Sequence, residues 1–89
     1  MKLDLNKSVI DLAGKELPNS NMGKLLASML VNGTKGDPMK LFHWAQKLYA
    51  GELLELDPTD AEVLKTIIRE NDQITILSKA QMLACFKEK

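Results

Sequence analysis

The residues most capable of chemistry in this chain are its single histidine, His43, and its single cysteine, Cys85. Nucleophilic catalysis by a cysteine requires a nearby base and a lowered thiol pKa. Cys85 lies within an apolar run, where a thiol normally stays protonated, and the helical spacing around His43 places it on a polar face. We therefore expect His43 to be a solvated surface residue and this pair to have no catalytic role.

Metal coordination has equally little support in the sequence. One histidine and one cysteine do not make a ligand cluster. The segment 57–68 lacks the glycine and the terminal glutamate of an EF-hand loop. The carboxylates of Asp57, Asp60 and Glu62 stand where a helix begins, a position that attracts acids for capping and dipole reasons alone. We expect no metal site.

The sequence also lacks the residues that a phosphate-binding loop requires. Gly23-Lys24 has the order found at the end of a P-loop, but Pro18 occupies the first glycine position and Leu25 replaces the required Ser or Thr. Gly23 is better explained by close packing at the start of a helix. A chain of 89 residues also leaves little room for a substrate pocket. We expect a protein that is not an enzyme and that binds no cofactor.

The charge is balanced overall but unevenly placed. Twelve Lys and Arg residues against twelve Asp and Glu residues give a net charge of zero, which argues against a general binder of nucleic acids or membrane surfaces. Residues 1–50 carry seven bases against four acids, and residues 51–89 carry five bases against eight acids. The acidic segment 51–72 is either a solvated face or a surface for a basic partner.

Length and composition predict one domain, 1–89, with 45% hydrophobic and 27% charged residues. The single cysteine fits a reducing compartment. The opening MKLDLNKS lacks the apolar region of a signal peptide, and no apolar run approaches the ~18 residues that span a bilayer. We expect a cytoplasmic protein without a membrane segment.

The segment 37–51, DPMKLFHWAQKLYAG, specifies both ends of a helix. Asp37 suits the N-cap, Pro38 the first helical position, and Gly51 the left-handed residue beyond the end. Trp44 falls at the edge of an apolar stripe about 120° wide. We expect 38–50 to be the central helix, with Lys40, His43 and Lys47 on its polar side. The stripe expected to face the core is Leu41, Phe42, Ala45, Leu48 and Tyr49.

The first 17 residues predict β structure. Leu3 and Leu5 alternate with polar residues, as in a half-buried strand. The segment 52–56 alternates roughly and is a candidate third strand.

A hairpin is predicted within this region. The segments 9–12 and 15–17 flank Ala13-Gly14, which is the spacing of a two-residue turn in which Gly14 supplies a positive φ. Because an isolated hairpin is marginal in water, we expect it to pack on the helices, with the candidate third strand beside it.

Apolar periodicity predicts three more helices, at 20–32, 59–71 and 73–87. The start of the helix 59–71 has two alternative caps, a box from Thr59 to Glu62 and Asp57 followed by Pro58. The residues expected to face inward are Met22, Leu25, Leu26, Met29 and Leu30 in the first helix and Val63, Leu64, Ile67 and Ile68 in the next.

The last predicted helix is apolar on two sides. Its main stripe is expected to face the core, while Met82 and Phe86 point the other way, near Cys85. Either another chain covers this second side, or Phe86 folds back onto the hairpin. The expected main stripe is Ile74, Ile76, Leu77, Ala80, Leu83 and Ala84. Together these elements predict an α+β fold, mostly α, with an N-terminal β-hairpin packed on about four short helices.

Four stretches resemble small proteins encoded by tailed phages and prophages: DLAGKEL after the first strand, then NMGKLLA, LYAGELLELDPTD and KAQML. The resemblance spans most of the chain but includes no catalytic or ligand signature. It implies an origin in a phage or prophage and expression inside a bacterial cell, without any particular activity. At position 13 this chain has alanine, where aspartate would make a stronger Asp-Gly turn.

Binding to another protein is the function that these residue types favour. Trp44, at the margin of its stripe, and Met82 and Phe86, on the second side of the last helix, are the interface candidates. We expect a phage or host protein as the partner, in phage assembly or in binding a host protein, and self-association through the last helix.

The alternative is a small DNA-binding regulator that uses the helices 59–71 and 73–87 as a helix-turn-helix. The reading helix has few bases (Lys79, Lys87 and Lys89), and the chain has a single arginine, Arg69. The best alternative basic patch is Lys40 and Lys47, with Lys24 and Lys35 nearby in sequence. These features favour a protein partner over a nucleic acid.

Overall fold

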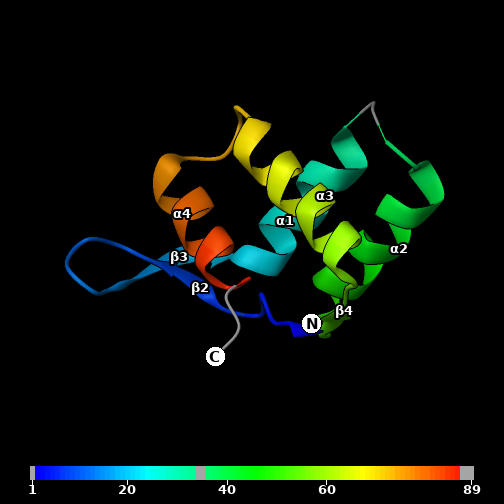
Figure 1. The fold of residues 1–89 in the computed structure, drawn as a ribbon. Coiled ribbons are helices and arrows are strands. Elements are labelled where there is room, and N and C mark those ends of the chain that lie inside the picture. Colours follow the sequence, from blue (N-terminus) through cyan, green and yellow to red (C-terminus); the bar gives the residue numbers. More distant parts are fainter. Residues whose placement is uncertain (1, 34–35, 87–89) are drawn as a thin grey trace.

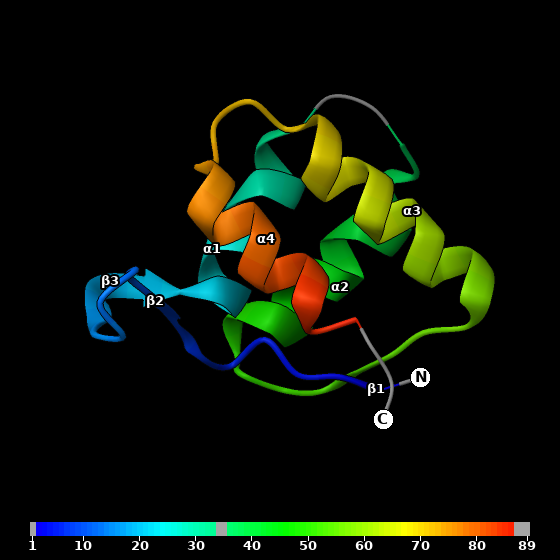
Figure 2. The same ribbon diagram turned by 60° about the vertical axis from the view of Figure 1, so that its left-hand side comes forward.

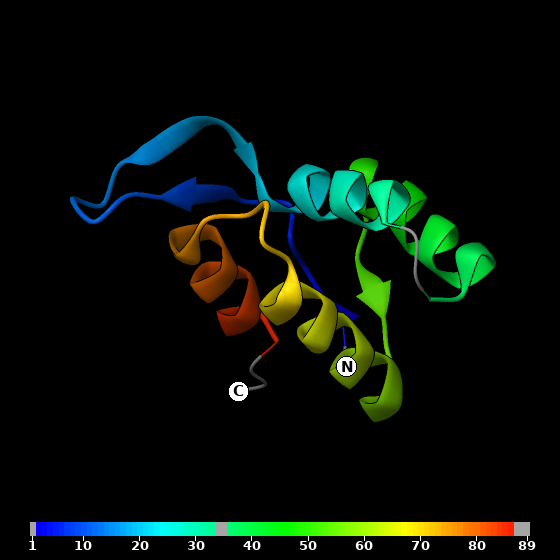
Figure 3. The same ribbon diagram turned by 90° about the horizontal axis from the view of Figure 1, so that it is seen from above.

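Two pairs of helices and two small antiparallel sheets make up residues 2–33 and 36–86, the part of the chain that this computed structural model describes. Seen from above, the pair α1–α2 and the pair α3–α4 lie on different sides, and the β2–β3 hairpin extends away from the helices (Figures 1 and 3). The predicted α+β class is confirmed. In chain order the elements are β1 (Lys2–Leu3), β2 (Ser8–Ile10), β3 (Glu16–Asn21), α1 (Met22–Asn32), α2 (Pro38–Tyr49), β4 (Leu54–Glu55), α3 (Pro58–Glu70) and α4 (Ile76–Ala84).

The hairpin forms as predicted, but its turn is wider. The Asp11 N–H donates to the Lys15 carbonyl (2.8 Å), the Gly14 N–H donates to the Asp11 carbonyl (3.0 Å), and Gly14 has φ +86°. These bonds close a three-residue loop rather than the two-residue Ala13-Gly14 turn. The Asp11 carboxylate stabilises it by accepting from the N–H groups of Ala13 and Lys15, both at 2.9 Å.

Strand β3 continues through Pro18, Asn19 and Ser20, residues whose types favour a break. Ser20 explains the continuation, because its buried hydroxyl accepts from the Val9 N–H (3.0 Å) and donates to the Leu17 carbonyl (2.6 Å). These bonds satisfy backbone groups where the register between the two strands shifts.

The candidate third strand, β4, pairs with β1 and not with the hairpin, so its predicted position was wrong. Leu3 lies opposite Leu54, and both side chains are fully buried. Leu5 is also buried, which confirms the alternation expected in the first segment. The β1–β4 ladder runs beneath the helices in the view of Figure 2.

Helices α1 and α2 approach each other closely at one end. A Cβ built on Gly23 would lie 2.8 Å from the Leu48 carbonyl oxygen and 3.4 Å from that of Leu5. Gly23 therefore serves close packing at a helix start, as expected. Both N-caps are side chains, since Asn21 accepts from the Lys24 N–H (3.0 Å) and Asp37 accepts from the Met39 N–H (3.1 Å).

Helix α2 is not the centre of the fold. It lies at one side of the molecule in Figure 1, and its core face is turned from the predicted one. Trp44 is buried at 5% exposure, whereas Phe42 and Tyr49 are 52% and 62% exposed. The physical reason is that the apolar arc, once Trp44 is included, spans about 160°, wider than one neighbouring layer covers. The core takes the indole side, and two residues of the predicted stripe face outward.

Helix α3 begins at the Asp57-Pro58 alternative, because the Asp57 carboxylate accepts from the Asp60 N–H at 2.7 Å. Thr59 then lies inside the helix and is not the cap. Ala61, Leu64 and Ile68 are buried, while Val63 of the predicted inner face is exposed.

Helix α4 is shorter than predicted, and the centre of its buried side is rotated from the predicted stripe. Thr75 caps it by accepting from the Ser78 N–H (3.2 Å), and the predicted end at 87 lies outside the described residues. Ser78 and Met82 are buried. Of the predicted core stripe, Ile76, Ala80 and Ala84 face solvent, whereas Ile74, Leu77 and Leu83 are partly buried against the core. The cause is Gln81, whose amide accepts from the Ile10 N–H (2.8 Å) and donates to the Ile10 carbonyl (2.6 Å). These two hydrogen bonds between Gln81 and β2 hold the helix in this rotation.

Candidate functional site

The outer side of the seam between α1 and α2 carries small residues. Ala27 and Ala45 are buried there, next to the larger and more exposed Val31 and Phe42. Small side chains at a helix–helix seam leave a groove, because neighbouring side chains do not fill the space above them. The sequence of the two helices thus builds a depression with an apolar floor.

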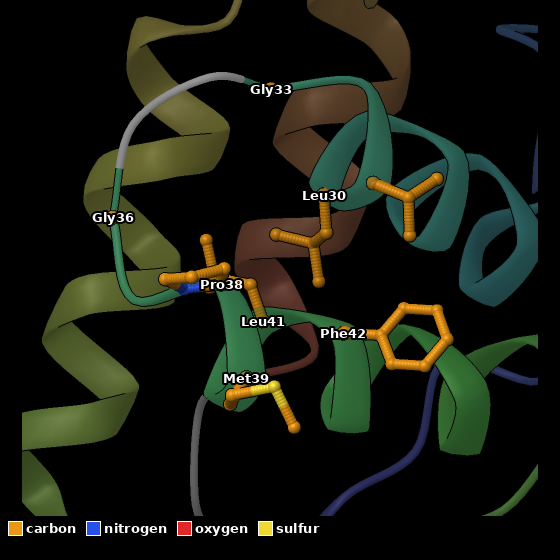
Figure 4. A pocket seen from close by; sticks show the side chains of 8 residues that line it. Leu30, Gly33, Gly36, Pro38, Met39, Leu41 and Phe42 are labelled. Carbon is orange, nitrogen blue, oxygen red and sulfur yellow. The ribbon is translucent and has the colours of Figure 1, made fainter.

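Two hollows lie on this side of the molecule, and Val31 and Phe42 line both. The first, over the alanine floor, has a volume of about 490 Å³ and extends to Tyr49. The second has a volume of about 430 Å³ and lies toward the α1–α2 connection. Figure 4 shows Leu30 of α1 and Leu41 and Phe42 of α2 among the side chains that line the second hollow.

Four large apolar side chains around these hollows are exposed: Val31 (52%), Met39 (76%), Phe42 (52%) and Tyr49 (62%). We call this surface, with its two hollows, the α1–α2 face. Half-exposed aromatic rings leave on the order of 100 Å² each in water, so the apolar patch totals several hundred Å². The largest apolar patch on a small protein is often of this size and is often functional.

Among the described residues, Lys24 is a basic residue at the border of the α1–α2 face. The ammonium group of Lys24 lies 5.3 Å from the centre of the Tyr49 ring, within the range of a cation–π contact. This contact orients the ring at the end of the first hollow. No charged side chain lines either hollow in the described part of the chain.

The three interface candidates named from the sequence are core residues. Trp44, Met82 and Phe86 are at most 5% exposed. Lys40 lies over the indole ring (5.7 Å to its centre), and Lys65 lies over the Phe86 ring (5.8 Å). Their placement on the surface was wrong. Phe86 is buried with Lys65 of α3 over its ring, and its packing onto the hairpin stays a prediction.

The proposed basic patch is divided. Lys40 donates to the Asp60 carboxylate at 2.9 Å, and this hydrogen bond, more than any other interaction, raises the lysine pKa above its ordinary value. Lys47 is half-buried and forms no ion pair with the described residues. Lys35 lies outside the described residues. A charge already engaged by a carboxylate offers little to a phosphate backbone.

His43 and Cys85 do not form a catalytic pair. His43 is exposed on α2, and no hydrogen bond connects it to Cys85 within residues 2–33 and 36–86. Burial raises the pKa of the Cys85 thiol, which keeps it protonated and unreactive near neutral pH. The same ranges contain no group of three or more His, Cys, Asp or Glu residues able to hold a metal ion.

Reasoning from the sequence missed the α1–α2 face. The sequence did contain a signal for this face, because the apolar arc of the helix 38–50 is wider than packing against a single neighbouring element requires. A second signal was the pair Ala27 and Ala45, which is too small to fill a surface seam.

Among the described residues, no helix combines the length and the apolar character required to cross a membrane. No protein-family model, no curated protein and no solved structure matches this chain.

Proposed function

We propose that this protein is a non-enzymatic interaction protein that binds another protein chain through the α1–α2 face. The observation that carries the proposal is the exposure of Phe42 and Tyr49 beside an alanine-floored groove. Aromatic residues are enriched in interface cores, where they pack into pockets of the partner. The resemblance to small phage and prophage proteins adds the expectation that the bound chain is a phage or host protein.

The alternative of a DNA-binding regulator has less support. A reading helix presents polar and basic side chains to base edges, whereas α4 presents Ile76, Ala80 and Ala84. Lys79 donates to the Arg69 carbonyl at 3.2 Å, and Gln81 is engaged with Ile10. Lys87 and Lys89 lie outside the described residues. A gel shift at low ionic strength that weakens steeply with added salt would favour this alternative instead.

Photo-cross-linking in bacterial cells tests the proposal directly. A benzophenone side chain is introduced at Gln46, which lines the first hollow, and at Gln73, an exposed residue before α4, as the matched control. We expect a discrete covalent product, identified by mass spectrometry as a particular protein chain, from position 46 and not from position 73. No product at 46, or the same products at both positions, would contradict binding through the α1–α2 face.

A further inference from the structure

We infer that the chain that docks on the α1–α2 face is a second copy of this protein, related to the first by a two-fold axis. This inference rests on the proposed function and names its partner. In a two-fold dimer the same patch serves both subunits, so it must contain both the projecting and the receiving part.

The shape of the α1–α2 face meets that requirement. Phe42 lines both hollows and stands half-exposed where they meet. A copy rotated by 180° places the Phe42 ring of each subunit into a hollow of the other. Two antiparallel helix pairs that pack in this way form a four-helix bundle, in which short helices cover their apolar faces.

The charges on and near the face are compatible with a second copy. The described residues that line the hollows are uncharged, and the bordering Lys24 lies at one end, next to Tyr49. A two-fold rotation about the middle of the face keeps the two Lys24 ammonium groups at opposite ends. The net charge of the chain is zero, so two copies approach without long-range repulsion.

The exposed area indicates a weak dimer. Four exposed apolar side chains and their polar surroundings on each subunit bury on the order of 1,000 Å² in total, the lower limit for a specific interface. Weak, transient interfaces lie at this end of the size range, so we expect monomer and dimer to exchange, with half of the chains paired at the weak end of the affinity range for proteins, roughly 10–100 μM.

Sedimentation velocity of the full chain between 5 and 500 μM, roughly a tenfold span on either side of that midpoint, measures this equilibrium. We expect the mass to rise from the 9.9 kDa monomer to twice that value and no further. Phe42→Ser and Tyr49→Ser should each move the midpoint at least about tenfold higher, since both remove an apolar anchor. Ile76→Ser is the control, because Ile76 is 84% exposed on α4, away from the α1–α2 face. It should leave the midpoint within about twofold.

A cross-linking experiment tests the two-fold symmetry. In a Cys85→Ser background, Val31→Cys places a thiol at the middle of the face and Thr66→Cys places one on α3. A short bismaleimide should join two copies through residue 31 into a covalent dimer and leave the residue-66 variant monomeric. Circular dichroism verifies that each variant is folded.

Three results would overturn the inference: a strict monomer up to 500 μM, well beyond the expected midpoint, a midpoint more sensitive to Ile76→Ser than to Phe42→Ser, or cross-linking through residue 66 that is as efficient as through residue 31. The photo-cross-linking experiment separates this inference from the proposed function. A product at position 46 that contains a different protein chain supports the proposed function and overturns self-association. A product that contains this chain supports both.

Discussion

Single residues set the spacing between elements in this protein. Gly23 lets α1 approach the last turn of α2 and the segment after β1, because it has no Cβ to meet the carbonyls of Leu48 and Leu5. Cys85, in contrast, contributes as a half-buried apolar group, with its thiol held protonated by burial. Neither role requires reactivity, and both are matters of packing.

Gly23→Ala should lower the free energy of unfolding by about 1–3 kcal/mol, because the new methyl group would lie 2.8 Å from a backbone oxygen and would force the helices apart. Gly33→Ala is the matched control, since its Cβ would meet nothing closer than 3.6 Å and its φ of −76° suits any residue. It should change stability by less than about 0.5 kcal/mol. Urea denaturation measures both, and equal effects would argue against the close approach.

The raised pKa of Cys85 gives a pH dependence with a definite sign. Above the ordinary thiol value of 9.0, the unfolded chain releases a proton that the folded chain retains. The free energy of unfolding should therefore fall as the pH rises from 9 through the folded-state pKa. Denaturation at pH 8 and pH 10 should show a larger loss for the natural chain than for Cys85→Ser. Equal losses of stability in the two proteins would mean that burial does not keep the Cys85 thiol protonated.

At the scale of elements, a single side chain joins the hairpin to the last helix. The hairpin is held to α4 by the Gln81 amide, which bonds to both polar groups of Ile10 as a neighbouring strand would. This contact occupies part of the outer edge of β2 and fixes which side of α4 faces inward. A free strand edge is a site for unwanted pairing, so the same amide also protects the hairpin.

Gln81→Glu tests this junction. A carboxylate still accepts from the Ile10 N–H but cannot donate to the Ile10 carbonyl, so we expect a loss of about 1–2 kcal/mol in the free energy of unfolding. Amide exchange should also become faster within β2 and β3. Gln73→Glu adds the same charge just before α4 and should leave exchange in the hairpin unchanged. Unaltered protection in the Gln81 variant would show that the hairpin is held by other contacts.

At the scale of the whole molecule, the rotation of α2 determines both the core and the exposed surface. Turning Trp44 inward lets it pack with Leu41 and Leu48, and the same rotation leaves Phe42 and Tyr49 outside. The core and the α1–α2 face are thus two consequences of one packing arrangement.

This rotation predicts that Trp44→Ala lowers the free energy of unfolding more than Phe42→Ala does. Trp44→Ala should cost about 3–5 kcal/mol, because it leaves a cavity among buried side chains. Phe42→Ala, at a half-exposed position, should cost about 1 kcal/mol or less. Since the first variant removes the only tryptophan, circular dichroism must follow both urea transitions. A larger loss for Phe42→Ala would mean that the predicted stripe, and not Trp44, faces the core.

The sequence by itself determined where α2 begins, offered the cap that starts α3 as one of two alternatives, and determined that a hairpin forms near the N-terminus. Asp37 with Pro38 and Asp57 with Pro58 act on N–H groups within a few residues, and Gly14 needs only its own φ. Such signals are local and survive in any fold. The inward alternation of Leu3 and Leu5 was predictable for the same reason.

Only the tertiary structure decided which sides of α2 and α4 are buried and which strands pair, whereas the predicted inner face of α1 is the buried one. The helices α2 and α4 have apolar residues over more of their surface than one neighbour covers, so several rotations satisfy the hydrophobic pattern equally well. The choice came from non-local contacts, such as Gln81 with Ile10 and β4 with β1. The α1–α2 face is the apolar surface that this choice leaves uncovered, because apolar periodicity records that a residue is hydrophobic but not which partner covers it.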